Sequence, residues 1–593
     1  MAKKHIDRAA LIATIRELKE LSNEQKSDIL QLISEQKKYG IVWEDSPEDV
    51  EENLRANVPV LVEDKDKAII SNADDAPNHI LIEGDNLEAL TALSYTHEGK
   101  IDVIYIDPPY NTGNKDFVYN DSFVDSEDGY RHSKWLSFME KRLKIAKKLL
   151  SDKGVIFISI GDDEECNLQL LCKEVFGEKN YIETYIWEST LRPDNSSPIL
   201  RRNAEFVLCC AKNKANILRF RNVPTATSGM ASLTKAKEKR QVLCFPSNYV
   251  RTTLPDGIYK AGLKENGGNL QWELKADAIV KDGIFISDVI LEGNSYWHTK
   301  KKIQQEQNAG TEIWIKSESF VPYYQKNTDS GNRPTKILPS SIVNDGIYGN
   351  TELNNIFNEK VFNNPKPSTL ISLLVNCTDN SNSVVLDFFA GSGTTLHATM
   401  QLNAEDGGHR QCILCTNNEN NICEEVTYER NKRVINGYTT PKGVEVEGLH
   451  DNSLRYYKIE DVPRDSSTTG LKKLMLASTD LLCIKNDLYE EKSLFGNIKL
   501  RKHIARYFDD DKQKMLIIYK VEAIESIVEE IKKMPDDTFI KVYVFSTNNY
   551  AMDADFEEVS DKVFLCALPA AIYNAYRKVL PRKNNVITEE EEV

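Results

Sequence analysis

The stretch from Lys100 to Phe117 constrains the fold more than any other part of the chain. It begins with a nearly continuous apolar run, Ile101 to Ile106, which is typical of a strand buried on both faces of a parallel sheet. The tetrapeptide Asp107-Pro108-Pro109-Tyr110 follows at once. Because consecutive prolines cannot donate ladder hydrogen bonds, the strand must end there. Ligands bind at the carboxyl edge of open α/β sheets, so this acid, its proline carbonyls and the aromatic ring are predicted at a reactive position.

The length and composition of the chain indicate a protein of several domains without a membrane segment. Its 593 residues are too many for one hydrophobic core. No apolar run reaches the roughly 18 residues that a membrane span needs, and the amino-terminal segment is charged and helix-periodic rather than signal-like. A cytoplasmic protein is therefore predicted. Cys412 and Cys415 have CxxC spacing, but no second pair accompanies them, so no metal site is expected.

Strand and helix patterns alternate on both sides of a central interruption. This alternation predicts right-handed crossovers in a mainly parallel sheet with helices on both faces. The chain then divides into an amino-terminal helical segment and connector (1–75), a first α/β half (76–190), an inserted mixed domain (191–355), a second α/β half (356–440) and a small accessory α/β domain with an acidic tail (441–593). The predicted elements of the main sheet are strands 80–82, 101–106, 155–160, 384–388 and 411–416 and helices 87–93, 133–150, 370–375 and 394–402.

The inserted domain carries a basic cluster in an otherwise acidic chain. The net charge is −16, yet residues 201 to 260 contain twelve Lys or Arg and three acidic residues. Local charge decides nucleic-acid binding more than the global value does. A basic run is also common on an ordinary solvated face, but its place between two halves of an α/β domain favours a binding role.

A glycine turn in the second half predicts a cofactor site. The segment from Asp387 to Thr394 combines a strand end, Gly391-x-Gly393 and a helix start, and glycines let the backbone approach a ligand closely. No lysine follows Gly393, which argues against a phosphate loop, and a dinucleotide fingerprint would need a third glycine.

Three acids at strand ends suggest which cofactor this is. Asp387 suits a cationic amino group, Glu419 suits ribose hydroxyls, and Asp85 suits an adenine amino group. An ammonium, a ribose and an adenine together describe S-adenosylmethionine. The alternative is that each acid only caps a helix.

These motifs resemble those of the amino-group DNA methyltransferases. Asp107-Pro108-Pro109-Tyr110 looks like their catalytic motif, and Phe389-Ala390-Gly391-Ser392-Gly393-Thr394 looks like their cofactor motif. The order of the two, with an insert between them, is similar to the β arrangement. The strings DPPYNTGNKDFVYND, HSKWLSFMEKRL, FNNPKP and TNNEN look most like the modification (Mod) subunits of type III restriction–modification systems, over roughly residues 79 to 440. One departure is Gly161-Asp162-Asp163, where Asp-Asp-Asn is expected.

The resemblance implies a Rossmann-like S-adenosylmethionine-dependent methyltransferase fold with circularly ordered motifs, an inserted target-recognition domain and a small C-terminal α/β domain. It implies double-stranded DNA as substrate, a homodimer, and a restriction (Res) subunit as partner. The implied catalytic residues are Asp107, Pro108, Pro109 and Tyr110. The implied cofactor residues are Asp85, Lys366, Pro367, Asp387, Phe389, Ala390, Gly391, Ser392, Gly393, Thr394 and Glu419. Candidate phosphate contacts in the insert are Arg201, Arg202, Arg219, Arg221, Lys237, Lys239 and Arg240.

The chemistry of adenine methylation fits these residue types. Asp107 and the Pro108 carbonyl can accept the two N6 hydrogens and so localise the nitrogen lone pair toward the methyl group. The base must leave the duplex, and stacking on Tyr110 offsets part of that cost. The resemblance implies Asp at position 107 for adenine N6 and Ser for cytosine N4. Two alternatives stay open: a DNA-recognition scaffold without catalysis, and the same chemistry on cytosine N4 or RNA.

Overall fold

The computed structural model describes residues 43, 48–73, 75–119, 122–125, 128–190, 203–217, 219–220, 231–234, 239–264, 271–295, 297, 300–308, 311–325, 338–344, 346–463, 468–546, 552–568, 571–572 and 574. The chain separates into two compact units, the second made of Arg219–Pro339 with residues 376–379. The predicted amino-terminal helices and the acidic tail lie outside the described residues. In the described ranges, no helix combines the length and the apolar character needed to span a membrane.

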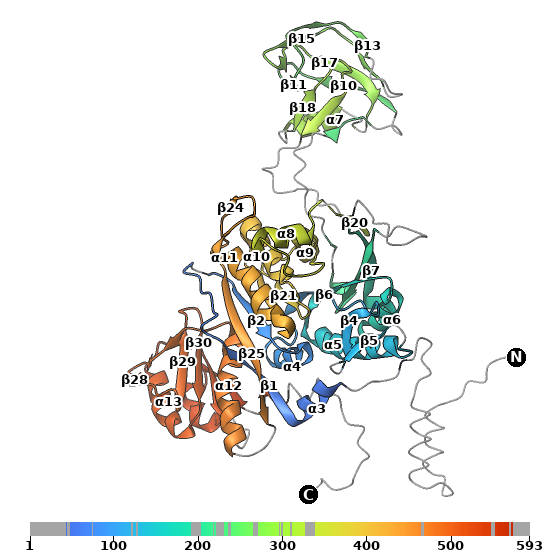
Figure 1. Cartoon of the computed structure of the whole chain (residues 1–593). Coiled ribbons are helices and arrows are strands. Elements are labelled where there is room, and N and C mark those ends of the chain that lie inside the picture. Colours follow the sequence, from blue (N-terminus) through green and yellow to red (C-terminus); the bar gives the residue numbers. More distant parts are fainter. Residues whose placement is uncertain are drawn as a thin grey trace, which may run out of the picture. The chain divides into compact units, whose positions relative to one another are not determined.

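Within the described residues, a ten-stranded sheet forms the centre of the first unit (Figure 1). Its strand order is β1-β25-β2-β22-β21-β3-β6-β8-β7-β20. From β25 to β6 all neighbours are parallel, whereas β1 and β8 run antiparallel to their neighbours. The strands are β1 (Asn57–Glu63), β2 (Asn78–Glu83), β3 (Ile101–Ile106), β6 (Leu150–Ile160), β7 (Tyr181–Glu188), β8 (Glu205–Ala211), β20 (Ser341–Val343), β21 (Val384–Asp387), β22 (Gln411–Thr416) and β25 (Ser453–Pro463).

This strand order confirms the predicted mainly parallel α/β sheet and its circular order. β21 and β22, from the second half of the chain, lie between β2 and β3, from the first half. Because β2, β22, β21 and β3 are parallel, their carboxyl ends meet at one edge of the sheet. The predicted acids at the ends of these four strands are therefore collected along that edge.

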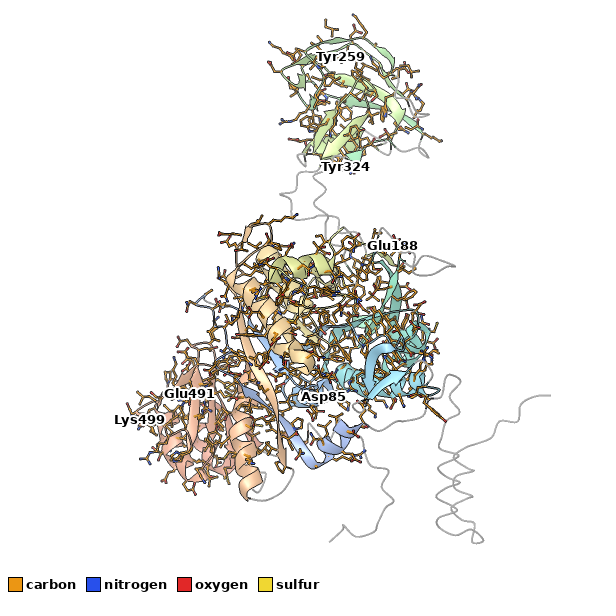
Figure 2. All side chains as sticks on the ribbon, viewed as in Figure 1. Asp85, Glu188, Tyr259, Tyr324, Glu491 and Lys499 are labelled. Carbon is orange, nitrogen blue, oxygen red and sulfur yellow. The ribbon has the colours of Figure 1, made fainter. Side chains whose placement is uncertain are left out.

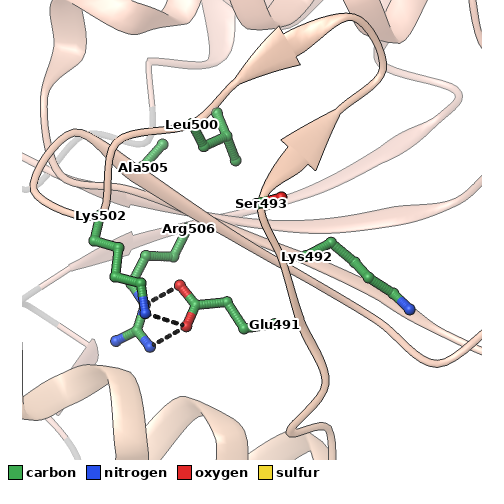
Figure 3. Close-up of a pocket in the computed structure, with 7 residues that line it drawn as sticks. All are labelled: Glu491, Lys492, Ser493, Leu500, Lys502, Ala505 and Arg506. Atoms are coloured by element: carbon green, nitrogen blue, oxygen red, sulfur yellow. Dashed lines mark hydrogen bonds and ion pairs between the residues drawn. The ribbon is translucent and has the colours of Figure 1, made fainter.

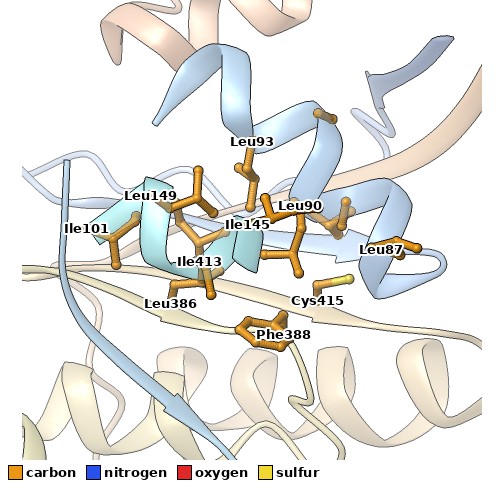
Figure 4. Close-up of a cluster of buried hydrophobic side chains, with 14 of the residues drawn as sticks. Leu87, Leu90, Leu93, Ile101, Ile145, Leu149, Leu386, Phe388, Ile413 and Cys415 are labelled. Atoms are coloured by element: carbon orange, nitrogen blue, oxygen red, sulfur yellow. The ribbon is translucent and has the colours of Figure 1, made fainter. Parts of the chain in front are cut away.

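Helices pack on the sheet through leucine and isoleucine side chains. In Figure 4, Leu87 and Leu90 of α4 lie over the strand residues Ile413 and Cys415, and Leu149 of α5 lies beside them. All five side chains are buried, and burying each of the four leucine and isoleucine side chains stabilises the fold by about 1.5–3 kcal/mol. The helices of this unit include α3 (Asp49–Ala56), α4 (Asn86–Thr96), α5 (Arg131–Leu149), α6 (Glu165–Phe176), α8 (Gly349–Phe357), α9 (Ser368–Asn376), α10 (Thr394–Asp406) and α11 (Glu429–Asn436).

Two strands join the sheet from outside the predicted α/β halves. β1 belongs to the segment that the sequence assigned to a connector, and β25 belongs to the predicted C-terminal segment. They pair with each other from Asn57 opposite Pro463 to Glu63 opposite Tyr457, and β25 also pairs with β2. The boundaries predicted at 75 and 440 therefore cut through this sheet. Local sequence could not reveal this, because the two strands stabilise each other across about four hundred residues of chain.

The C-terminal region forms a five-stranded sheet of its own within the described residues. Its order is β26-β29-β30-β31-β32, parallel from β30 to β32, and it has a separate apolar cluster around Leu516, Ile527 and Val542. Strands and helices thus alternate in this region as well. The elements are α12 (Thr468–Asn486), β26 (Glu491–Lys492), β29 (Ala505–Asp509), β30 (Lys514–Ile518), α13 (Ile524–Lys532), β31 (Ile540–Phe545) and β32 (Val563–Leu568).

The second unit is a small β-rich body with an aromatic core. In its described part a four-stranded sheet, β10-β17-β14-β13, accompanies a seven-stranded one, β12-β15-β16-β11-β18-β19-β9. Trp272, Trp297 and Phe285 are almost fully buried at its centre. This unit is narrower than the predicted insert 191–355, since β8, β20 and α8 belong to the first unit. Its elements are β9 (Ala231–Ser232), β10 (Arg240–Phe245), β11 (Val250–Thr252), β12 (Gly257–Tyr259), β13 (Gly262–Lys264), β14 (Trp272–Leu274), β15 (Ala278–Lys281), β16 (Ile284–Phe285), β17 (Val289–Asn294), α7 (Lys300–Asn308), β18 (Glu312–Ile315) and β19 (Pro322–Gln325).

Candidate active site

Asp107 follows β3 directly and meets a lysine from the other half of the chain. Lys366 Nζ donates to both carboxylate oxygens of Asp107, at 2.9 and 2.8 Å, and lies 3.5 Å from Glu205 Oε2. Tyr110 Oη donates to the same Glu205 oxygen at 2.8 Å. Two carboxylates, one ammonium and one phenol therefore form a connected network at the edge of the sheet. The catalytic tetrapeptide and Lys366 are brought together, although 256 residues separate Tyr110 from Lys366 in the sequence.

Burial and charge act in opposite senses on this network. Burial raises the pKa of Asp107 above its ordinary value, while the Lys366 ammonium opposes that rise. For Lys366, burial favours the neutral form, but Asp107 and Glu205 more than offset it and raise the pKa above its ordinary value. The lysine is therefore held as an ammonium between the two carboxylates.

Side chains from neighbouring elements hold the loop after β3 in place. Trp135 Nε1 donates to the Pro109 carbonyl at 2.8 Å. Asn111 is fully buried in a left-handed conformation (φ +54°), and its amide donates to Glu164 Oε1 at 2.6 Å. A Cβ on Gly161 would lie 2.9 Å from the Tyr110 ring. The glycine that departs from the expected family pattern thus leaves room for the tyrosine.

The predicted cofactor turn has the geometry of a tight strand-to-helix connection. Asp387 is 2% exposed; it accepts hydrogen bonds from the Phe389 N–H at 3.0 Å and the Thr395 hydroxyl at 2.5 Å. Burial raises the pKa of Asp387 to about 7. Gly393 adopts φ +74°, and a Cβ there would lie 2.5 Å from Asn431 Nδ2. Glycine is needed at this position both for its backbone angle and for the space it leaves.

A fully buried arginine, Arg430, donates hydrogen bonds to the cofactor turn. Arg430 Nη1 donates to Thr394 Oγ1 at 2.6 Å and to Ser392 Oγ at 3.2 Å. Its Nη2 pairs with Glu352 at 3.0 Å. Although burial would raise the pKa of Glu352, the Arg430 guanidinium holds that pKa below its ordinary value. The position of the turn therefore depends on a buried charge pair.

The Lys366 segment is tied to the cofactor turn through its backbone. Thr394 Oγ1 donates to the Lys366 carbonyl at 3.2 Å, and a Cβ on Gly349 would lie 1.9 Å from the Pro365 carbonyl oxygen. The sequence predicted Lys366 and Pro367 as cofactor residues. In the structure the Lys366 backbone lies beside the cofactor turn, while its ammonium reaches the catalytic acid.

The two remaining predicted acids lie at strand ends as expected. Asp85 follows β2 and caps α4, accepting from the Leu87 N–H at 2.7 Å (Figure 2). Its second oxygen lies 3.7 Å from Arg142 Nη2, and its side chain is 40% exposed. Asp85 is thus a helix cap that still presents an oxygen to solvent. Glu419 begins a short helical turn beyond β22 and is exposed.

Sequence reasoning missed Glu205, Glu164 and Arg430. Each acts through partners from distant segments: Glu205 begins β8, Glu164 precedes α6, and Arg430 lies on α11. The one available signal was the acid of Glu205 at the start of the apolar run EFVLCC. Arg430 gave none, because its helix also carries the exposed Lys432 and the partly exposed Arg433.

The predicted DNA contacts are only partly within the described residues. Arg201, Arg202, Arg221 and Lys237 lie outside them, while Arg219 and Lys239 are exposed. Arg240 donates to the Gln271 and Glu292 carbonyls at 3.0 and 3.1 Å, so it ties β10 to its neighbours. The role of these residues in phosphate binding stays a prediction.

A cavity of about 160 Å³ lies in the C-terminal region (Figure 3). Glu491 accepts from Arg506 at 2.9 and 2.8 Å and from Lys502 at 3.0 Å. None of the predicted catalytic or cofactor residues lines it. This cavity is therefore separate from the candidate catalytic and cofactor residues.

Comparison with known proteins agrees with this arrangement. Residues 101–435 match the DNA methylase family of N6/N4 methyltransferases. The chain is 31% identical over 404 residues to the type III restriction-modification enzyme StyLTI Mod subunit of Salmonella typhimurium, covering 61% of this chain and 55% of that one. It is 32% identical over 411 residues to the EcoPI Mod subunit of Escherichia phage P1, covering 62% of each.

A third relative has a length closer to the matched region. The type II methyltransferase M.KpnI of Klebsiella pneumoniae is 31% identical over 402 residues, covering 66% of this chain and 92% of that one. The chain thus spans between half and two thirds of the length of the Mod subunits and nearly all of M.KpnI. The family match includes both the catalytic tetrapeptide and the cofactor turn, so the chain belongs to the DNA methylase family of N6/N4 methyltransferases.

Proposed function

We propose that this protein transfers a methyl group from S-adenosylmethionine to the N6 atom of a flipped-out adenine in double-stranded DNA. The observation that carries the proposal is the meeting of Asp107 and Asp387 at neighbouring strand ends of one sheet. Asp107 would accept from the adenine amino group, and Asp387 would hold the ammonium of the cofactor. Asp107 also favours adenine, since the family resemblance implies serine there for cytosine N4.

The residues around Asp387 fit this cofactor. A buried carboxylate is stabilised by a nearby cation, yet no lysine or arginine pairs with Asp387 in the part of the chain that the structure describes. Gly391 and Gly393 keep the adjoining backbone free of side chains. The bound cofactor supplies an activated methyl sulfonium, so the protein mainly positions the two reactants.

Asp107 acts as an orienting acceptor in this mechanism. Its carboxylate and the Pro108 carbonyl accept hydrogen bonds from the two N6–H groups, which orients the nitrogen lone pair toward the methyl group. Tyr110 offers its ring to the extruded base. The Glu205 and Trp135 hydrogen bonds fix the phenol and the loop backbone in advance, which reduces the reorganisation needed during the reaction.

Methylation-aware sequencing tests the proposal directly. Genomic DNA from a host with and without the gene should differ by N6-methyladenine at one short sequence motif. The wild-type protein should also transfer tritiated methyl groups to DNA carrying that motif. N4-methylcytosine at the motif, or no modification at all, would contradict the proposal.

The Mod relatives suggest the assembly in which the enzyme works. We propose that the chain forms a homodimer and that the second unit recognises the target sequence, with a restriction subunit as the partner for cleavage. Light scattering of the purified protein should give twice the chain mass. A monomer that is fully active on DNA would contradict the dimer.

Shortening Tyr110 should weaken capture of the base. Tyr110→Ala removes the stacking surface, which is worth about 1–3 kcal/mol, so kcat/KM for DNA should fall by roughly 10- to 100-fold. Tyr110→Phe keeps the ring and loses only the bond to Glu205, so it should lose far less. An equal fall in kcat/KM for both variants would show that the Tyr110 hydroxyl, and not its ring, captures the base.

Cofactor affinity should depend on pH through Asp387. Burial raises the pKa of this carboxyl to about 7, so below that pH the free protein holds it neutral and must ionise it to bind an ammonium. Affinity for S-adenosylmethionine should therefore rise by about tenfold per pH unit below pH 7 and reach its maximum between about pH 7 and 8, above which the α-ammonium of the ligand loses its own proton. Calorimetric titration at several pH values measures this. Asp387→Asn should bind weakly with a flat profile, and a flat wild-type profile would contradict the assignment.

A further inference from the structure

The Lys366 ammonium occupies the place that a target amino group needs. It donates to both oxygens of Asp107 and also lies 5.1 Å from the centroid of the Tyr110 ring. Asp107 and Tyr110 are the groups that the proposed function assigns to the base, as hydrogen-bond acceptor and as stacking surface. A base cannot use both of them while Lys366 stays where it is.

Moving the Lys366 ammonium away from Asp107 costs free energy, and the size of that cost depends on whether the ammonium finds another carboxylate. The Lys366 side chain is only 10% exposed, and a buried charge that loses its partner is strongly destabilising. Glu205 Oε2 lies 3.5 Å from the ammonium, and the Glu205 side chain is 30% exposed. It is thus a second carboxylate within reach of the same side chain.

The Lys366 backbone is held, so the movement is confined to the side chain. The hydrogen bond from Thr394 fixes its carbonyl, and the preceding Pro365 carbonyl packs closely against Gly349. Rotation of the flexible lysine stem can shorten the distance to Glu205 while it lengthens the distance to Asp107. The Lys366 ammonium then keeps a carboxylate partner throughout this movement.

We propose that Glu205 is a positioning residue that receives the Lys366 ammonium when the target base enters and binds Asp107. This inference rests on the proposed function. In the free protein the Lys366 ammonium lies between both carboxylates, and in the base-bound state Glu205 alone keeps it paired. Glu205 thereby lowers the cost of base entry without touching the base.

The variant Glu205→Gln isolates this role. The glutamine amide oxygen can still accept a hydrogen bond from the Tyr110 hydroxyl, but the side chain lacks the negative charge that would hold Lys366. Single-turnover methylation of a duplex carrying the motif found by sequencing should fall by at least about tenfold, since loss of one partner of a buried charge pair is costly. Affinity for the same duplex with an abasic target position should not change, because no base then displaces Lys366. Affinity for S-adenosylmethionine should not change either.

Two further variants complete the test. Glu183→Gln makes the same change at an exposed position on β7 and should behave as wild type. Glu205→Asp keeps the charge and should recover part of the rate. Wild-type methylation by Glu205→Gln, or an equal loss of affinity for the abasic duplex, would overturn this inference alone. A wild-type protein without any methylation would overturn the proposed function and this inference with it.

Discussion

Replacing Asp107 with alanine should lower the rate of methyl transfer by at least about 10²-fold, the loss seen when one preorganised hydrogen-bonding group is removed from a reacting centre. The variant lacks the carboxylate that accepts a hydrogen bond from the N6 amino group, so the nitrogen lone pair stays delocalised into the ring. Asp387 and the glycine turn are untouched, so affinity for S-adenosylmethionine should remain at the wild-type level.

Single-turnover transfer of labelled methyl groups, alongside calorimetric titration of the cofactor, measures both quantities. Asp163→Asn is the matched control, because Asp163 is exposed in the loop after β6 and should not affect transfer. Methylation by Asp107→Ala at the wild-type rate would reject the mechanism. A parallel loss of cofactor binding would show instead that the variant disturbs the sheet edge.

Replacing Arg430 with leucine should destabilise the first unit by about 3–5 kcal/mol, because it leaves the Glu352 carboxylate, only 13% exposed, without its cationic partner. Arg430 is fully buried and donates to Ser392 and Thr394 in the cofactor turn. Affinity for S-adenosylmethionine should fall as well, since the turn loses its support.

Differential scanning calorimetry and cofactor titration test this pair of effects. Lys432→Met on the same helix removes a cation that is 46% exposed and 3.5 Å from Glu429, so it should change stability by less than about 1 kcal/mol. The double variant Arg430→Leu/Glu352→Leu should recover part of the stability, because no unpaired charge remains. Equal stability of the Arg430 and Lys432 variants would contradict the role assigned to the buried pair.

Sequence reasoning captured the elements whose signals are local. The apolar run before Asp107 and the glycine turn after Asp387 each carry their meaning within a few residues, and both lie at strand ends as predicted. The parallel order followed from the alternation of strands and helices. These features suffice for the fold class and for placing the predicted catalytic and cofactor motifs at strand ends.

The parts that sequence could not supply depend on distant partners. β1 joins the sheet only because β25 pairs with it along its whole length, and nothing near residue 57 signals that pairing. Glu205 belongs to the active site only because β8 brings it to Lys366 and Tyr110. The pairing of Lys366 with Asp107 joins segments on either side of the insert, and no local pattern encodes that contact.

The position of β21 and β22 in the sheet has a consequence for synthesis of the protein. β3, β6, β8 and β7 can pair once residue 211 has been made, but β2 has no neighbour until β22 and β25 appear. At about 5–20 residues per second, translation puts an interval on the order of tens of seconds between β2 and β22. During that time the nascent chain carries an unpaired hydrophobic strand and one open edge of β3. The cofactor site can therefore assemble only after β22 and α11 (Glu429–Asn436) have been synthesised.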